Sequence, residues 1–267
     1  MPASDLELLN EAARRAGEIA VSFWGQDPEQ WDKGSGAGPV TEADIAVNGM
    51  LREMLLSARP DYGWLSEESE DEPARLEREN VFVIDPIDGT RAFIAGERSW
   101  AHALAVVRGG KVQAGLVHLP LLGKTFAAVR GGGARLNGRR LRVPARRALE
   151  GACVLSTRKS LRSGRWKDGP PPVRRHFRPS LAYRLALVAE GRFDAMLTLH
   201  PTWEWDVAAG SLIASEAGAR VTDAAGLPLR FNNPEPCLDG LLAAPDGLHA
   251  ALRERLSGAG GAPAAPA

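Results

Sequence analysis

Some features are scarce in this chain of 267 residues, and each absence excludes a class of protein. The chain has two cysteines, Cys153 and Cys237, without a second ligand motif near either, which argues against a disulfide framework or a thiolate metal site. No apolar run approaches the roughly 18 residues of a membrane span. The N-terminus lacks the basic and apolar regions of a signal peptide. We therefore expect a cytoplasmic protein with reduced thiols.

Net charge is also absent, because 33 Lys and Arg residues balance 33 Asp and Glu residues. Without a global field we expect neither a nucleic acid polymer nor a membrane as partner, so a charged ligand needs local chemistry. The histidines are scattered without ligand spacing, and we expect them to be structural or surface residues. They are His102, His118, His176, His200 and His249.

The most informative stretch covers residues 81–93. Residues 81–84 are apolar and mostly β-branched, which predicts a buried strand. Pro86 lacks an N–H group, so we expect the strand to stop at Asp85. Asp85 and Asp88 would then lie on a rigid turn, followed by Gly89 and the hydroxyl of Thr90. Two carboxylates beside a helix start suit hard cations and a phosphate, although a solvated turn is the alternative.

The order of predicted elements divides the chain into two parts. Helices followed by antiparallel strands occupy residues 1–145, and strands alternate with helices in residues 146–257. We therefore expect an N-terminal α+β subdomain carrying most of the candidate ligands, and a C-terminal α/β subdomain. Residues 258–267 contain only Gly, Ala and Pro, and we expect a disordered tail.

Other acidic residues also fall at the ends of predicted elements. Asp44 lies in the first turn of a helix for which Thr41 is the expected N-cap. Glu67 and Glu68 follow a short predicted strand, and Asp206 begins an apolar helix. Asp206 has a simpler interpretation as an N-cap. Ligands gather at the ends of elements in α/β folds, which favours a shared site.

Four motifs, in their order and spacing, resemble those of the inositol monophosphatase superfamily. They are TEAD at residues 41–44, SEES at 66–69, DPIDGT at 85–90 and WDVAAG at 205–210. The resemblance extends from the first helix to Leu256. It implies a layered αβαβα sandwich of the sugar-phosphatase type, with an antiparallel sheet in the N-terminal half and a mixed α/β C-terminal half. It also implies a Mg²⁺-dependent phosphomonoesterase.

The same resemblance implies a role for each motif residue. Asp44 and Thr90 would position and deprotonate the attacking water, with Glu68 close by, and the N–H groups of Gly89 and Thr90 would bind phosphate oxygens. Oxygen ligands suit Mg²⁺, and two cations can stabilise phosphate-ester hydrolysis. The ligands of two or three Mg²⁺ ions would be Glu67, Asp85, the Ile87 carbonyl, Asp88 and Asp206.

The residues after DPIDGT bear on the substrate. Arg91 followed by Ala92-Phe93-Ile94 looks more like the 3'(2'),5'-bisphosphate nucleotidase branch, which predicts 3'-phosphoadenosine 5'-phosphate as substrate. We expect Ser180 near the sugar, although Pro179 stands where the family usually has glycine. The cations expected at a second phosphate are Arg91, Arg158, Lys159 and Arg184.

Other substrates and one other class of protein stay open. Inositol 1-phosphate is the main alternative, followed by histidinol phosphate and fructose bisphosphate. A protein of another class would be a non-catalytic regulator that binds a metal or a nucleotide. The resemblance further predicts a homodimer and inhibition by Li⁺.

Overall fold

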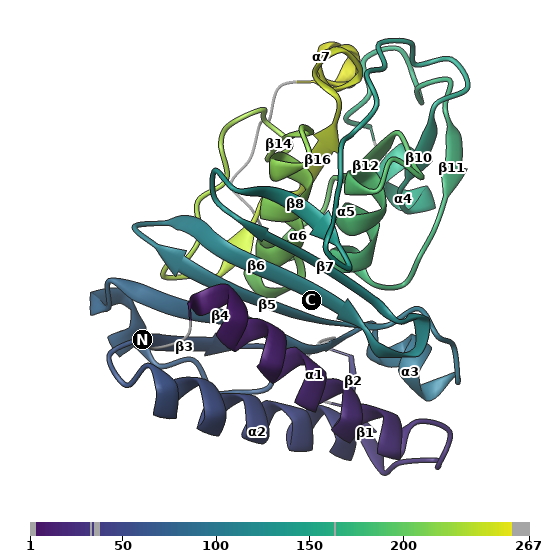
Figure 1. Ribbon diagram of the computed structural model, residues 1–267. Helices are drawn as coiled ribbons and strands as arrows, with labels where there is room; N and C mark the ends of the chain where they lie inside the picture. The colour runs from purple at the N-terminus through teal and green to yellow at the C-terminus, as the bar shows by residue number, and fades with distance from the viewer. Residues whose placement is uncertain (1–3, 33, 35–37, 163, 258–267) are drawn as a thin grey trace.

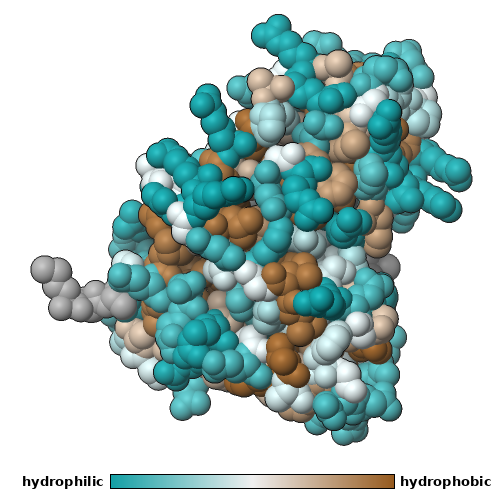
Figure 2. All heavy atoms as spheres, turned by 45° about the vertical axis from the view of Figure 1, so that its right-hand side comes forward, coloured by the Kyte–Doolittle hydropathy of each residue, from teal (hydrophilic) through white to brown (hydrophobic). Residues whose placement is uncertain are grey.

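The structure is a computed structural model that describes residues 4–32, 34, 38–162 and 164–257. The predicted disordered tail, residues 258–267, lies outside these residues. Within them, no helix has both the length and the apolar character needed to cross a membrane. Figure 2 shows hydrophilic side chains projecting from the upper part of one face, with smaller hydrophobic patches between them.

The first half of the chain supplies a seven-stranded sheet with the order β3-β4-β5-β6-β7-β8-β9. Its strands are β3 Gly63–Ser66, β4 Asn80–Asp88, β5 Ala101–Arg108, β6 Lys111–Leu119, β7 Lys124–Val129, β8 Gly133–Leu136 and β9 Arg139–Arg140. Every neighbouring pair is antiparallel except β3 and β4, which are parallel. The other elements of this half are α1 Asp5–Phe23, β1 Gln30–Asp32, β2 Pro39–Thr41, α2 Glu42–Ala58, the short helices η1 Pro73–Glu77 and η2 Pro120–Leu122, and α3 Thr90–Ile94.

The second half supplies a mixed five-stranded sheet with the order β11-β10-β12-β16-β14. Its strands are β10 Cys153–Leu155, β11 Arg174–His176, β12 Ala195–Thr198, β14 Arg220–Thr222 and β16 Leu241–Ala244. A separate two-stranded ribbon pairs β13 Thr202–Trp203 with β15 Cys237–Leu238. The helices are α4 Arg158–Leu161, α5 Leu181–Ala189, α6 Glu204–Glu216 and α7 Asp246–Arg255.

These elements stack in five layers (Figure 1). Helices α1 and α2 cover one face of the seven-stranded sheet, and α5 and α6 lie between the two sheets. Residues of α4 and α7 cover the outer face of the smaller sheet. The order helix, sheet, helix, sheet, helix confirms the predicted αβαβα sandwich.

The buried strand β4 shows how the sequence produces this layering. Phe82 and Ile84 pack toward α1 and α2, whereas Val81 and Val83 pack toward α5 and α6. Successive side chains of a strand point to opposite faces, so a strand covered by helices on both sides needs apolar residues at every position. The continuous apolar run at residues 81–84 meets this requirement.

The N-cap of α2 matches the sequence prediction, and α1 begins with a cap of the same kind. Ser4 caps α1 with Glu7, and Thr41 caps α2 with Asp44, each as a reciprocal capping box. The division near residue 145 stays a prediction. Every strand of the seven-stranded sheet precedes it, and every strand of the five-stranded sheet follows it.

Two local predictions were wrong. Strand β4 does not stop at Asp85 but runs to Asp88, and its register with β5 shifts between these two residues. A register irregularity tolerates Pro86 because no ladder hydrogen bond is required from it there. Asp206 is not an N-cap, because α6 begins at Glu204 after the cap residue Trp203. Asp206 therefore lies in the first turn of α6.

Gly210 allows α5 and α6 to pack closely, which gives a first prediction. A Cβ atom at Gly210 would lie 2.7 Å from the Leu185 Cβ, whereas one at Gly49 in α2 would meet nothing within 4 Å. We expect Gly210→Ala to lower the free energy of unfolding by about 1–3 kcal/mol through overpacking. Gly49→Ala is the matched control and should raise it by roughly 0.5–1 kcal/mol. Urea unfolding measures both, and equal effects of the two substitutions would contradict the close packing.

Candidate active site

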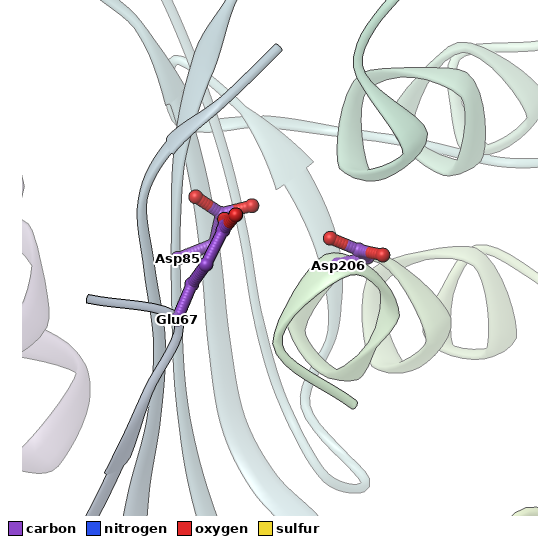
Figure 3. Close-up of side chains that lie close together, drawn as sticks. All are labelled: Glu67, Asp85 and Asp206. Atoms are coloured by element: carbon purple, nitrogen blue, oxygen red, sulfur yellow. The ribbon is translucent and has the colours of Figure 1, made fainter. Parts of the chain in front are cut away.

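A cavity of about 430 Å³ opens where the two halves of the chain meet. Carboxylates of Glu67, Asp85 and Asp206 lie in it, and one ligand atom from each lies within 4.8 Å of the others. Figure 3 shows Glu67 and Asp85 side by side, with Asp206 facing them from the start of α6. The other lining residues are Gly38, Pro39, Asp88, Gly89, Thr90, Arg91, Ala92, Glu97, Phe177 and Pro179.

Glu67 and Asp85 meet because β3 and β4 are parallel. Ser66 at the end of β3 pairs with Ile84, so the next residue of each strand lies at the same edge of the sheet. The Glu67 N–H donates to the Ile84 carbonyl at 3.2 Å and extends this pairing by one residue. A parallel pair thus brings carboxylates 18 residues apart in the sequence to one place.

The turn after Glu67 is held from α2. Asn48 donates to the Glu68 carbonyl at 3.1 Å and to the Ser69 hydroxyl at 3.0 Å, and it accepts from the Ser66 hydroxyl at 2.8 Å. The indole N–H of Trp64 also donates to Ser69. Glu68 is half-buried beside Glu67. This role of Asn48 was not predicted, because no pattern in the neighbouring sequence indicates a polar contact with a residue 20 positions away.

The start of α6 is anchored by Glu204, which the sequence analysis also missed. Its buried carboxylate accepts from the backbone N–H groups of Asn232 and Asn233 at 2.6 and 2.9 Å. The rings of Trp203 and Trp205 stack with centroids 4.9 Å apart. These contacts fix the first turn of α6 and thereby the position of Asp206.

The electrostatics of this cluster favour a bound cation. Burial, then Glu67, Asp88 and Asp206, raise the pKa of Asp85 well above its usual range. Burial, then Asp88 and Glu67, raise the pKa of Asp206 in the same way. Both carboxylate oxygens of Asp85 are buried without a hydrogen-bond partner. Such oxygens are costly to bury unless a cation or a proton compensates them, and three convergent carboxylates suit Mg²⁺.

The predicted water-activating pair is close together. Asp44 accepts from the Thr41 N–H at 2.9 Å and from the Thr41 hydroxyl at 2.6 Å. The Thr90 hydroxyl lies 3.4 Å from Asp44 Oδ1 and 3.2 Å from the Ile87 carbonyl oxygen, so its proton has two acceptors. Gly89, with a φ of 102°, turns the chain from β4 into α3. The structure therefore joins Asp44 and Thr90 across 46 residues.

Asp88 makes contacts that the sequence analysis did not foresee. One carboxylate oxygen accepts from the Ser180 hydroxyl at 2.5 Å and the Ala182 N–H at 2.6 Å, and the other accepts from the Leu181 N–H at 3.2 Å. Burial raises the pKa of Asp88 to about 6, an effect these hydrogen bonds oppose. Asp88 thus binds the N-terminus of α5, and its role as a metal ligand stays a prediction. Ser180 is the buried N-cap of α5, and its predicted contact with the substrate also stays a prediction.

The four predicted cations lie in different places. Arg91 lines the cavity beside Gly38. Arg158 and Lys159 are exposed on α4, and the described residues that line the cavity do not include them. Arg184 is buried, and its guanidinium donates to the carbonyls of Arg178 at 2.5 Å and Pro179 at 3.3 Å. Of the four, only Arg91 borders the cavity.

A buried histidine supports the irregular end of β4. The Nδ1 atom of His102 contacts the Pro86 carbonyl, which can only accept, so this nitrogen carries the proton. Burial lowers the pKa of His102 to about 3. His102 also stacks with His118, at a ring centroid distance of 6.1 Å. The expected structural role fits this histidine, although its place beside the candidate site was not predicted.

A five-layered αβαβα sandwich with a carboxylate-lined cavity between its halves is the arrangement expected of a metal-dependent phosphomonoesterase of the sugar-phosphatase type. The model of the "Inositol monophosphatase family" matches residues 2–257. The chain is 37% identical to an inositol-1-monophosphatase of Rhizobium meliloti over 238 residues, which cover 83% of this chain and 86% of that protein.

Two further comparisons agree. A fructose-1,6-bisphosphatase/inositol-1-monophosphatase of Thermotoga maritima is 34% identical over 226 residues, covering 83% of this chain and 85% of that protein. The crystal structure of the extragenic suppressor protein suhB of Bartonella henselae superimposes with a TM-score of 0.80 at 30% identity, covering 95% of this chain and 98% of that one. The chain belongs to the inositol monophosphatase family and is a phosphomonoester hydrolase.

The carboxylates of the candidate metal site give a second prediction. Saturating Mg²⁺ should stabilise the folded protein and raise its melting temperature. At a Mg²⁺ concentration one hundred times the dissociation constant of the site, the free energy of unfolding should increase by about 2.7 kcal/mol. Asp85→Asn should stabilise the metal-free protein, because it removes one buried charge, and should abolish the Mg²⁺-dependent rise. Differential scanning calorimetry measures both effects. The exposed Asp61→Asn is the control and should keep the rise, and a rise retained by Asp85→Asn would contradict the site.

His102 gives a third prediction. Its pKa is lowered from 6.5 to about 3 in the folded protein, so the unfolded state binds an extra proton between these values. The contribution of His102 to the free energy of unfolding is therefore complete above pH 6.5. It falls as the pH is lowered, by up to about 1.4 kcal/mol per pH unit. Urea midpoints from pH 7 to 4 should fall less steeply for His102→Asn than for the wild type. A slope for His102→Asn identical to that of the wild type would refute the assignment.

Proposed function

We propose that this protein hydrolyses inositol 1-phosphate or a similar monophosphate of a cyclic polyol, with Mg²⁺ as cofactor. The Rhizobium meliloti and Thermotoga maritima relatives carry the inositol-1-monophosphatase name, which supports this substrate class. The observation that carries the proposal is the composition of the cavity. Three convergent carboxylates form one side, and Arg91 is the one basic residue among the described lining residues.

The same observation disfavours the bisphosphate nucleotidase that we expected from Arg91. A second phosphate needs several cations or N–H donors around it. Arg158 and Lys159 are exposed on α4, and Arg184 donates to backbone carbonyls instead. Arg91 alone is a weak basis for binding a second dianion, so a monophosphate is the better-supported substrate.

In the proposed reaction the protein holds the phosphate beside an activated water. Glu67, Asp85 and Asp206 hold the cations, with Asp88 and the Ile87 carbonyl as further expected ligands. Divalent cations bound there supply Lewis-acid stabilisation of the charge on the phosphate oxygens. The backbone N–H groups of Gly89 and Thr90 are expected to donate to the same oxygens. Several donors thus share the charge that develops in phosphoryl transfer.

Proton transfer from the attacking water falls to Thr90 and Asp44. The Thr90 hydroxyl donates its proton to Asp44 or to the Ile87 carbonyl, which leaves its oxygen able to accept from a water. Asp44 Oδ2 is occupied by two hydrogen bonds from Thr41, so Oδ1 is the atom that faces Thr90. These contacts support a relay of the proton from water through Thr90 to Asp44, with Glu68 nearby.

Several properties from the family resemblance stay predictions. They are a cytoplasmic location, a homodimer, inhibition by Li⁺ and the binding of two or three Mg²⁺ ions. The non-catalytic regulator is disfavoured because Asp44, Thr90 and the carboxylate cluster are all present and mutually placed for catalysis.

A substrate panel gives the fourth prediction. Phosphate release should be fastest from inositol 1-phosphate, compared with 3'-phosphoadenosine 5'-phosphate, histidinol phosphate and fructose 1,6-bisphosphate, and should stop on removal of Mg²⁺. Asp44→Asn should lower kcat by about 10²–10⁴-fold, because it removes the general base, while keeping the Mg²⁺-dependent rise in melting temperature.

Two results would contradict the proposal. A preference for 3'-phosphoadenosine 5'-phosphate would establish the nucleotidase instead. No turnover of any ester, with Mg²⁺ binding intact, would favour the non-catalytic regulator.

A further inference from the structure

Phe177 is an exposed aromatic residue at the rim of the candidate active site. It follows directly after β11, its side chain is 46% exposed, and it lines the cavity that contains Glu67, Asp85 and Asp206. Among the described residues, the other exposed large hydrophobic side chains do not line this cavity; they are Val21, Trp31, Ile45, Leu76, Val129 and Leu227. Fully burying an exposed phenyl ring is worth about 1.5–3 kcal/mol, so a ligand that covers the exposed part of this ring gains a fraction of that free energy.

The ring of Phe177 is held in place by Arg184. The guanidinium carbon of Arg184 lies 4.5 Å from the ring centroid, and the guanidinium donates to the carbonyls of Arg178 and Pro179. One buried cation therefore holds three consecutive residues of the rim. Burial lowers the pKa of Arg184 to about 10, which still leaves it charged at neutral pH.

The remaining rim residues differ in chemistry from Phe177. Arg91 and Glu97 present charge, and Pro179 presents a small apolar surface. An acyclic polyol phosphate has no rigid C–H face and would leave the phenyl ring in water. A ligand with a ring would cover it, because the face of a saturated or aromatic ring is apolar and packs on an aromatic side chain.

We propose that Phe177 is a specificity-determining residue that binds the ring face of the alcohol group of the substrate, and that Arg184 is the residue that positions it. This contact would account for a preference for the cyclic ester proposed above over esters of acyclic alcohols. This inference rests on the proposed phosphatase function and assigns its preference for a cyclic ester to one residue and its support. A cavity of about 430 Å³ is within the roughly 300–1,000 Å³ range of small-molecule sites and accommodates such an ester.

The test compares a cyclic with an acyclic ester at saturating Mg²⁺. We expect Phe177→Ala to lower kcat/KM for inositol 1-phosphate by about tenfold, mainly through KM, and to change kcat/KM for glycerol 2-phosphate by less than about twofold. Phe177→Tyr should restore the wild-type ratio of the two values, because it keeps the ring. Leu227→Ala, at an exposed apolar residue outside the cavity lining, is the control and should leave both values unchanged.

Arg184→Lys tests the positioning role. Lysine keeps the charge but loses the planar group that stacks on the ring and donates to two carbonyls. It should reduce the ratio of the two kcat/KM values toward that of Phe177→Ala. A wild-type ratio in this variant would remove Arg184 from the proposal.

The outcomes separate the two proposals. Equal losses for both esters in Phe177→Ala, or no loss for either, would overturn the role of Phe177 while leaving the phosphatase function intact. Absence of turnover in the wild type would overturn the proposed function. In that case, calorimetric titration of inositol 1-phosphate with Mg²⁺ present tests Phe177 separately: about tenfold weaker binding by Phe177→Ala supports the inference, and unchanged binding refutes it.

Discussion

Mutual repulsion among buried carboxylates is the constraint on which the rest of this structure depends. Glu67, Asp85 and Asp206 converge at the cavity, where Asp85 is buried and the other two are half-buried, and the charged forms of Asp85 and Asp206 are disfavoured there without a counterion. A fold reaches such an arrangement only if other contacts hold each carboxylate in place. The parallel pairing of β3 with β4 fixes two of them, and Glu204 anchors the helix that carries the third. The resulting affinity for a cation comes from this enforced proximity.

Two of the acidic residues also serve as parts of helix ends. Asp44 completes the capping box of α2, and Asp88 accepts from the first two N–H groups of α5. Helix ends leave N–H groups without partners, so these carboxylates stabilise the fold while they line or adjoin the site. Losing either one would weaken both the fold and the site. The stability of such a variant must therefore be measured together with its kinetics, to tell whether lost activity comes from the fold or from the site.

Local patterns in the sequence predicted much of this architecture. The capping residue Thr41 identified the start of α2, and the apolar run before Asp85 identified the central strand, because these signals depend on neighbours in the sequence. The motif resemblance added the layered fold and the acidic cluster. The continuation of β4 past Pro86 was missed, since it depends on pairing with β5 and on support from His102.

Side-chain partners across long stretches of sequence were the least predictable part. Asp88 meets the start of α5 more than 90 residues away, and Arg184 turns to the carbonyls of the rim although its charge suggested a phosphate. In both cases the charge of the side chain could be read from the sequence. The direction in which the side chain points depends on tertiary packing, which no local pattern encodes. Arg91, chosen for its place after the DPIDGT motif, is the exception because its neighbours already belong to the site.

The contact between Asp88 and the start of α5 joins the two halves of the chain, so the site can be completed only after the second half has been synthesised. Asp44, Glu67, Asp85 and Asp88 are all translated before Ser180 and Asp206, so a nascent chain carries an incomplete acidic cluster until the second half has emerged. Contacts of such long sequence separation form late in folding, because the intervening chain must be ordered first. A partial chain that ends before Asp206 lacks one member of the carboxylate cluster, so we expect it to have no phosphatase activity.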